Sequence, residues 1–197
     1  DRRCNDQTIP PWSGERHKMM TRTIFSGFGG QGVLSMGFTL ANAAMLEGKY
    51  VTYLPSYGVE VRGGTANCTV VVSDEEIASP VASEPEFVVA MNQPSFNRFQ
   101  NILSAGGLIC VNASLVNTDV ARSDIEVLSI PTTELAERLG TTKVANMIML
   151  GALIKASGII SFDDMIKNLG ELLGEGKAKL IKLNKEALEV GFNYVKE

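Results

Sequence analysis

The stretch that decides the fold is IFSGFGGQG, residues 24–32, which is followed by an apolar run with helical spacing. Its glycines fit the pattern G-x-G-x-x-G. A strand, a glycine turn and a helix in this order let backbone N–H groups approach a phosphate closely, and the positive end of the helix dipole favours the anion. The stretch therefore predicts a strand-turn-helix unit. Its candidate cofactor-binding residues are Gly27, Gly29, Gly30, Gln31 and Gly32.

The acidic residue of a dinucleotide site is not at its usual place. Such sites carry an Asp or Glu about 20 residues beyond the glycines, where it binds the ribose hydroxyls. This chain has LPSY, residues 54–57, in that region, and Glu60 comes later. Two interpretations of the glycines stay open: a self-sufficient NAD(P)- or nucleotide-binding protein, and glycines that only permit close packing of the strand against the helix.

A second polar block, SYGVEVRGG at residues 56–64, follows the strand expected over residues 50–54. Ligands of open α/β sheets bind at the edge formed by the carboxyl ends of the strands. A guanidinium held there by a carboxylate would bind a phosphate or a substrate carboxylate bidentately. The candidate residues for an active-site or subunit interface are Ser56, Tyr57, Glu60, Arg62 and Gly63.

Three carboxamides extend this candidate site. Asn92 and Gln93 follow an apolar run over residues 87–91, which is typical of a strand buried on both faces. They are either site residues at the edge of the sheet or turn and cap residues, and Ser95 is expected to cap the next helix. Asn146 falls in the first turn of a helix expected over residues 144–156.

The elements alternate as in a parallel sheet covered by helices on both faces. The expected fold is α/β, a single Rossmann-like domain with a mostly parallel open sheet, which spans residues 19–197. Residues 1–18 are expected to be a flexible N-terminal tail from an expression vector or an upstream start. Strands are expected at 22–27, 50–54, 68–73, 87–91, 108–111 and 127–130, and helices at 31–47, 132–139, 144–156 and about 177–195.

Composition narrows the function classes. A chain of 197 residues with 45% hydrophobic content and a net charge of −4 fits one domain with a sizeable core. Its scattered Lys and Arg residues give no nucleic-acid patch, and no apolar run reaches the roughly 18 residues of a membrane span. Cys4, Cys68 and Cys110 lack the C-x-x-C spacing of zinc or iron–sulfur ligands. We expect a cytoplasmic protein that binds no metal.

Taken together, GFGGQG, the block at 56–64 and the Asn146 segment resemble the gamma subunit, or gamma domain, of the 2-oxoacid:ferredoxin oxidoreductases. The resemblance covers residues 22 to about 193. That family includes the pyruvate, 2-oxoglutarate, branched-chain and indolepyruvate enzymes. The resemblance implies oxidative decarboxylation of a 2-oxoacid on thiamine diphosphate, electron transfer through iron–sulfur clusters to ferredoxin, and acyl transfer to coenzyme A.

The resemblance implies an assembly role for this chain, with no catalytic residue of its own. Its partners would be alpha, beta and delta subunits, which would hold the thiamine diphosphate, the magnesium ion and the [4Fe-4S] clusters. Ferredoxin would be reached through the complex, and coenzyme A could be shared with this chain. The isolated chain would be inactive. The short form favours 2-oxoglutarate as the substrate, and a self-sufficient NAD(P)-binding oxidoreductase is the alternative.

Overall fold

The computed structural model describes residues 20–57, 65–119, 122–173 and 178–196. Its centre is a six-stranded sheet with the order β2-β3-β1-β4-β5-β6. The strands are β1 (Met20–Phe28), β2 (Tyr50–Tyr57), β3 (Thr65–Ser73), β4 (Phe87–Ala90), β5 (Leu108–Asn112) and β6 (Glu126–Ile130). Only β3 runs against the others, because β1, β4, β5 and β6 pair in parallel and β3 pairs antiparallel with both β1 and β2. The expected mostly parallel open sheet is confirmed.

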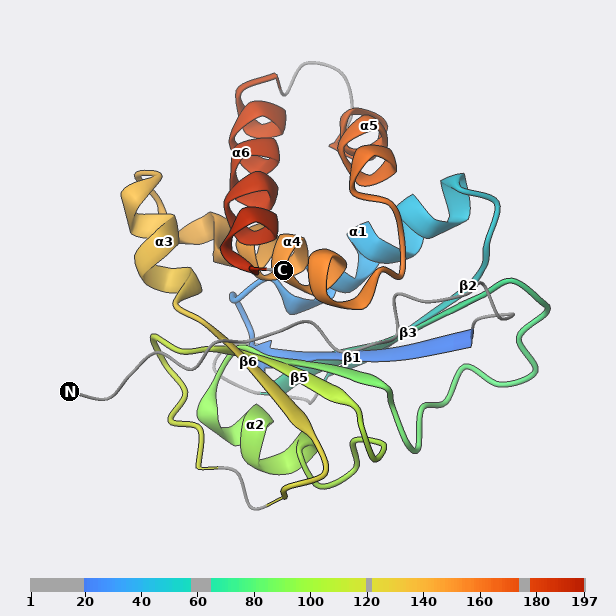
Figure 1. The fold of residues 1–197 in the computed structure, drawn as a ribbon. Coiled ribbons are helices and arrows are strands. Elements are labelled where there is room, and N and C mark those ends of the chain that lie inside the picture. The colour runs from blue at the N-terminus through green and yellow to red at the C-terminus, as the bar shows by residue number, and fades with distance from the viewer. Residues whose placement is uncertain (1–19, 58–64, 120–121, 174–177, 197) are drawn as a thin grey trace.

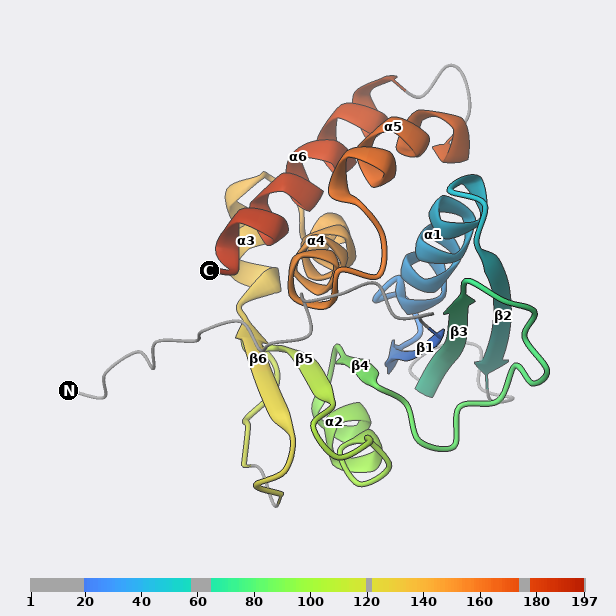
Figure 2. The ribbon, with the colours of Figure 1, turned by 45° about the vertical axis from the view of Figure 1, so that its right-hand side comes forward.

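Helices cover both faces of the sheet, but unequally (Figures 1 and 2). The helix α2 (Gln93–Phe99) packs under β1, β4 and β5, and the other helices lie on the opposite face. These others are α1 (Val33–Leu46), α3 (Thr132–Arg138), α4 (Ala145–Ser157), α5 (Phe162–Leu173) and α6 (Ala178–Tyr194), with a short 3-10 turn η2 (Thr142–Val144) before α4. Among the described residues, no helix is both long enough and apolar enough for a membrane span.

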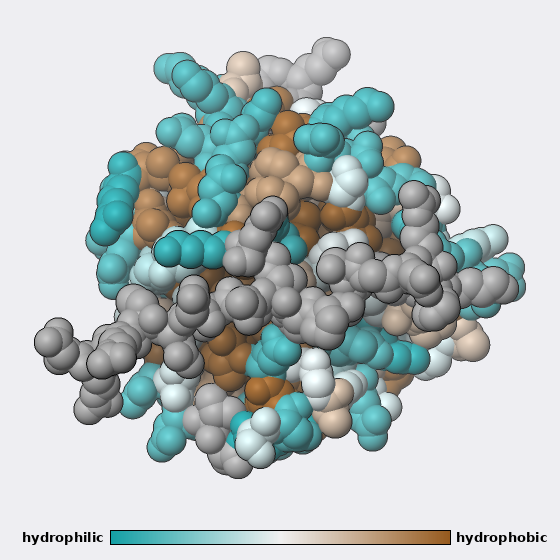
Figure 3. Space-filling model, in the orientation of Figure 1, coloured by the Kyte–Doolittle hydropathy of each residue, from teal (hydrophilic) through white to brown (hydrophobic). Residues whose placement is uncertain are grey.

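The alternation of side chains along β1 divides the core in two. Phe25 belongs to the large cluster under α1, α4 and α6, whereas its neighbour Ile24 belongs to the smaller cluster over α2. All four residues of β4 are buried, as expected for a central parallel strand. In the space-filling view, brown apolar surface is interspersed with teal polar groups over the helical layer above the sheet (Figure 3).

The hairpin strands β2 and β3 are longer than the sequence predicts. The expected end of β2 at Leu54 is wrong, since β2 continues to Tyr57, and β3 begins at Thr65 instead of Cys68. Cross-strand pairing explains the difference, because Tyr57 pairs with Ala66 and the pairing outweighs the poor strand propensity of Pro55. Proline is tolerated there because β2 is an edge strand.

The helices α4 and α6 touch through their backbones. A Cβ atom on Gly151 would overlap the carbonyl of Leu188, and one on Gly191 would overlap the carbonyl of Ile148. Glycine has no side chain to keep the two helices apart, so the backbones of α4 and α6 pack directly against each other. The first turn of α4, which carries Asn146, is thereby fixed over the sheet.

Candidate functional site

The carboxyl ends of β1 and β2 lie at one edge of the sheet. Asn67 of β3 pairs with Ser26 on one side and with Ser56 on the other. The sequence-predicted residues Ser56 and Tyr57 therefore stand two strands away from the glycine turn, as the last residues of β2. Glu60, Arg62 and Gly63 lie outside the described residues.

Two hydrogen bonds between Gln31 and Phe28 close the glycine turn. The backbone N–H of Gln31 donates to the carbonyl of Phe28 at 3.1 Å, and the backbone N–H of Phe28 donates to Oε1 of Gln31 at 2.7 Å. Gly29 and Gly30 form the exposed tip between them. Gly30 has φ of 101°, a conformation that other residues rarely adopt. The tip thus presents bare backbone to solvent.

The other two glycines of the motif serve packing. A Cβ on the buried Gly27 would lie 2.8 Å from both Oε1 of Gln31 and Cγ1 of Val33. A Cβ on Gly32 would overlap the carboxamide of Asn146, and Gly32 also has a positive φ of 73°. The packing interpretation therefore accounts for Gly27 and Gly32, whereas a Cβ on Gly30 would meet no atom within 4 Å.

The turn leads directly into α1, so Gly32 is its N-cap residue. Glycine offers no side-chain acceptor to the first N–H groups of the helix. The carbonyl of Gly32 accepts from the backbone N–H of Met36 at 2.9 Å and from Nδ2 of Asn146 at 3.3 Å. Asn146 is 7% exposed. The structure thus joins Asn146 to the glycine turn, with its side chain facing inward.

Asn92 also meets the turn. Its Nδ2 donates to Oε1 of Gln31 at 3.2 Å, and Nε2 of Gln31 donates to the carbonyl of Met91 at 3.0 Å. Oδ1 of Asn92 accepts from the backbone N–H of Ser95 at 2.9 Å, so Asn92 is the N-cap of α2. The expectation that Ser95 caps this helix is wrong: the Ser95 hydroxyl accepts from the Ser26 hydroxyl at 2.8 Å.

Gln93 does not join this group. Its Nε2 donates to Oδ1 of Asn97 at 2.9 Å, and its Oε1 accepts from the backbone N–H of Asn117 at 2.8 Å. It ties α2 to the loop after β5. The sequence reasoning missed Asn112, which is buried at the end of β5 and donates through Nδ2 to the Thr133 hydroxyl at 2.9 Å. The sequence pattern that indicated Asn92, a carboxamide at the end of an apolar strand, could also have indicated Asn112.

The described part of this edge offers backbone N–H groups, carboxamides and hydroxyls. The thiols of Cys68 and Cys110 are buried in the sheet, and burial raises each pKa to about 12, so both stay protonated at neutral pH. Among the described residues, no three His, Cys, Asp or Glu side chains are grouped to hold a metal ion. The backbone N–H groups, carboxamides and hydroxyls of this edge can bind and orient a ligand or a partner's backbone.

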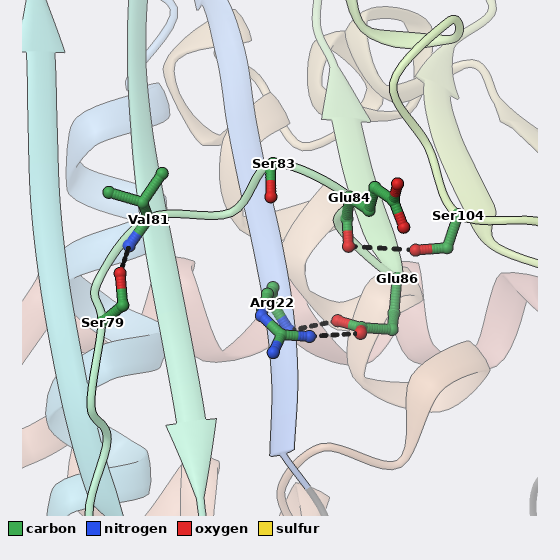
Figure 4. Close-up of a pocket in the computed structure, with 7 residues that line it drawn as sticks. All are labelled: Arg22, Ser79, Val81, Ser83, Glu84, Glu86 and Ser104. Atoms are coloured by element: carbon green, nitrogen blue, oxygen red, sulfur yellow. Dashed lines mark hydrogen bonds and ion pairs between the residues drawn. The ribbon is translucent and has the colours of Figure 1, made fainter.

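A polar pocket of about 470 Å³ lies at the opposite, amino edge of the sheet (Figure 4). Arg22 faces Glu86 there, with Nη1 and Oε1 2.8 Å apart, and the Ser104 hydroxyl donates to the carbonyl of Glu84 at 3.0 Å. Arg22 and Glu86 neutralise each other, and Glu84 adds a second carboxylate to the lining. We assign no ligand to it.

Together, the sheet order and the glycine turn define a Rossmann-like α/β domain. Residues 22–194 match the family described as pyruvate ferredoxin/flavodoxin oxidoreductase. The chain belongs to this family.

Known members of this family differ in length. The chain is 38% identical over 177 residues to the ketoisovalerate oxidoreductase subunit VorA of Methanothermobacter thermautotrophicus, covering 89% of this chain and 36% of that protein. It is 35% identical to the 2-oxoglutarate synthase subunit KorC of Methanocaldococcus jannaschii, covering 92% of this chain and 97% of that one. The chain thus spans about a third of the VorA protein and nearly all of KorC.

A solved structure agrees with the fold. The gamma subunit of a keto/oxoacid ferredoxin oxidoreductase from Geobacter sulfurreducens PCA superposes with a TM-score of 0.74 at 28% identity. The match covers 88% of this chain and 96% of that one. The resemblance to a gamma subunit seen in the sequence is confirmed.

Proposed function

We propose that this chain is the gamma subunit of a multi-subunit 2-oxoacid:ferredoxin oxidoreductase. It completes, with partner subunits, a site that converts a 2-oxoacid to an acyl-coenzyme A. The observation that carries the proposal is the exposed Gly29-Gly30 backbone at the carboxyl edge, in a chain of this family. The described residues of that edge supply no nucleophile paired with a base. The chemistry would therefore come from partners that hold the thiamine diphosphate, magnesium and iron–sulfur clusters.

The turn is suited to one phosphate of coenzyme A. The N-terminus of a helix without a side-chain cap, preceded by glycines, favours an anion. We further propose 2-oxoglutarate as the 2-oxoacid, with ferredoxin as the acceptor reached through the complex. Support for this substrate is the match to KorC over nearly the whole length of both chains.

An apolar surface on one flank of the domain suits a partner subunit. It comprises the exposed Phe38 and Met45 of α1 and the half-buried Tyr53 of the edge strand β2, which faces the same side of the sheet as α1. The Phe38 ring packs edge-on against Tyr53, with the centroids 5.9 Å apart, which joins the two elements. Contiguous apolar surface and an unpaired strand edge are typical of interaction sites. We assign this α1–β2 surface to the alpha or beta subunit.

The test is purification of the tagged chain from its source organism, followed by native mass spectrometry. We expect larger partners carrying iron and thiamine diphosphate, and coenzyme A-dependent oxidation by the complex. The oxidation should be fastest with 2-oxoglutarate when compared with pyruvate and ketoisovalerate. The isolated chain should be inert with all three. A lone chain that binds and turns over NAD(P)H would overturn the proposal in favour of a self-sufficient oxidoreductase.

A matched pair of variants tests the α1–β2 surface. Phe38→Glu places a charge on it and should reduce the recovered partner at least about fivefold, since about 1 kcal/mol of interface energy has that effect. Val81→Glu makes the same kind of change at an exposed valine outside this surface and should leave recovery unchanged. Equal recovery with both variants would remove the surface from the interface.

A further inference from the structure

The side chain of Gln31 makes three hydrogen bonds within the protein. Its Oε1 accepts from the Phe28 backbone N–H at 2.7 Å and from Asn92 Nδ2 at 3.2 Å. Its Nε2 donates to the carbonyl of Met91 at 3.0 Å. A carboxamide oxygen has two lone pairs, and both are occupied here. The oxygen of Gln31 thus has no lone pair left for a ligand.

These bonds connect two corners of the sheet. Phe28 ends β1, whereas Met91 and Asn92 follow β4, the neighbouring parallel strand. Asn92 in turn caps α2 through its Oδ1. The position of the exposed tip therefore depends on the start of α2 through one chain of carboxamide bonds.

We infer that Gln31 is a positioning residue that holds the Gly29-Gly30 backbone for its ligand by fastening the turn to the β4–α2 corner. This inference rests on the proposed function in one respect, that the ligand is coenzyme A. It differs from the expectation that Gln31 binds a cofactor directly, which stays a prediction. Two glycines in succession have wide conformational freedom, and the bonds of Gln31 remove that freedom before the ligand arrives. Such preorganisation improves binding without adding a contact.

The test variant is Gln31→Met, which keeps the length of the side chain and removes its hydrogen bonds. Gln100→Met is the matched control. Gln100 is 7% exposed near the C-terminus of α2, and its Oε1 has no hydrogen-bond partner in the structure. The same substitution there leaves the glycine turn untouched.

The first measurement is amide hydrogen exchange of the full chain alone, followed by NMR. We expect the protection of the Phe28 amide to fall at least about tenfold in Gln31→Met and to stay within twofold of the wild type in Gln100→Met, because only the first loses the acceptor of that N–H. Unchanged protection in Gln31→Met would mean that packing alone holds the turn, and it would overturn the inference.

The second measurement is steady-state kinetics of the purified complex. Gln31→Met should raise the KM for coenzyme A at least about fivefold and leave kcat within twofold of the wild type. The reason is that the substitution disorders only the Gly29-Gly30 backbone, which binds the ligand. Lost protection with an unchanged KM would overturn the positioning role. A wild-type chain that forms no complex would refute the proposed function separately, and the exchange result would then decide alone whether Gln31 orders the turn.

Discussion

Among the described residues, the groups that join segments at the amino edge of the sheet are ions, whereas those at the carboxyl edge are neutral carboxamides and hydroxyls. Arg22 pairs with Glu86, Lys49 pairs with Asp74, and Arg122 pairs with Asp124, each beside the start of a strand or the end of β3. At the carboxyl edge Gln31, Asn92, Asn112 and Asn146 make the corresponding connections.

The difference shows how an edge can be rigid without being charged. A carboxamide both donates and accepts, so it can link two backbone segments and leave no net charge behind. An ion pair at the same place would bring a carboxylate that repels an incoming anion. With neutral links around the glycine turn, the positive end of the α1 dipole favours an anion there. These three ion pairs lie at the edge where no ligand is proposed.

The largest predicted effect compares two left-handed glycines, one at each edge. Gly32→Ala should cost about 3 kcal/mol of unfolding free energy, from backbone strain of about 1–2 kcal/mol and from overlap with Asn146. Gly48→Ala, at φ 80° with no atom within 4 Å of its Cβ, should cost only the strain. Urea unfolding of both variants measures this. Equal losses would show that the contact between Gly32 and Asn146 adds nothing.

The next effect concerns two buried asparagines. Asn146→Ala should cost about 1–2 kcal/mol, because the bond to Gly32 joins α4 to α1 and the packing of the amide is also lost. Asn184→Ala should stay within about 0.5 kcal/mol, since that amide only bonds the Leu180 carbonyl of its own helix, and alanine favours the helix. Thermal or urea unfolding compares them. A larger loss for Asn184→Ala would contradict the special role of the carboxyl edge.

A smaller effect is expected for the ion pair of Arg22 with Glu86. A double-mutant cycle with Arg22→Met and Glu86→Gln should give a coupling of about 0.5 kcal/mol, as for other part-exposed pairs. Glutamine retains the acceptor for the backbone N–H of Arg22, which Glu86 now binds at 2.6 Å. In 1 M salt, where charges are screened beyond about 3 Å, the coupling should shrink. A coupling independent of salt would mean that the amino edge is not held by charge.

The smallest effect is a pH dependence. Arg122 donates two hydrogen bonds to Asp124, which lowers the pKa of that carboxyl below its usual value. The pair therefore stabilises the fold above the unfolded pKa of about 3.9, and the stabilisation is lost as the pH falls through the lower folded pKa. Asp124→Asn should flatten the stability curve slightly in this acid range. Superimposable curves for the two proteins between pH 2 and 5 would refute the contribution.

The sequence predicted the parts of the fold that depend on local pattern. The glycine turn, the apolar run before Asn92 and the helix ended by Gly158 all lie where expected. The family followed from motifs at fixed spacing. Placement of Asn146 in a first turn was also correct, since α4 begins at Ala145.

Properties set by contacts across the fold did not follow from the pattern. The reversed direction of β3 depends on its two neighbours, and no local propensity encodes it. Ser95 is a residue type that often caps helices. Here its hydroxyl accepts a hydrogen bond from the buried hydroxyl of Ser26, and Asn92 caps α2 instead. The apolar run after the glycine turn correctly indicated α1. Its Phe38 and Met45 are nevertheless exposed, and the buried face of the helix includes Met36 and Leu40.

The close crossing of α4 and α6 also sets an order for biosynthesis. The ribosome makes the glycine turn early, but the helix that carries Asn146 is held from behind by the glycine contacts with α6, which is made long afterwards. The bonds of the turn to Met91 and Asn92 need only the chain up to β4 and α2, whereas its bond to Asn146 needs α4, which lies more than a hundred residues further along the chain. During translation the ligand-facing edge should thus be completed late, which keeps an unfinished chain from presenting a finished binding surface to its partners.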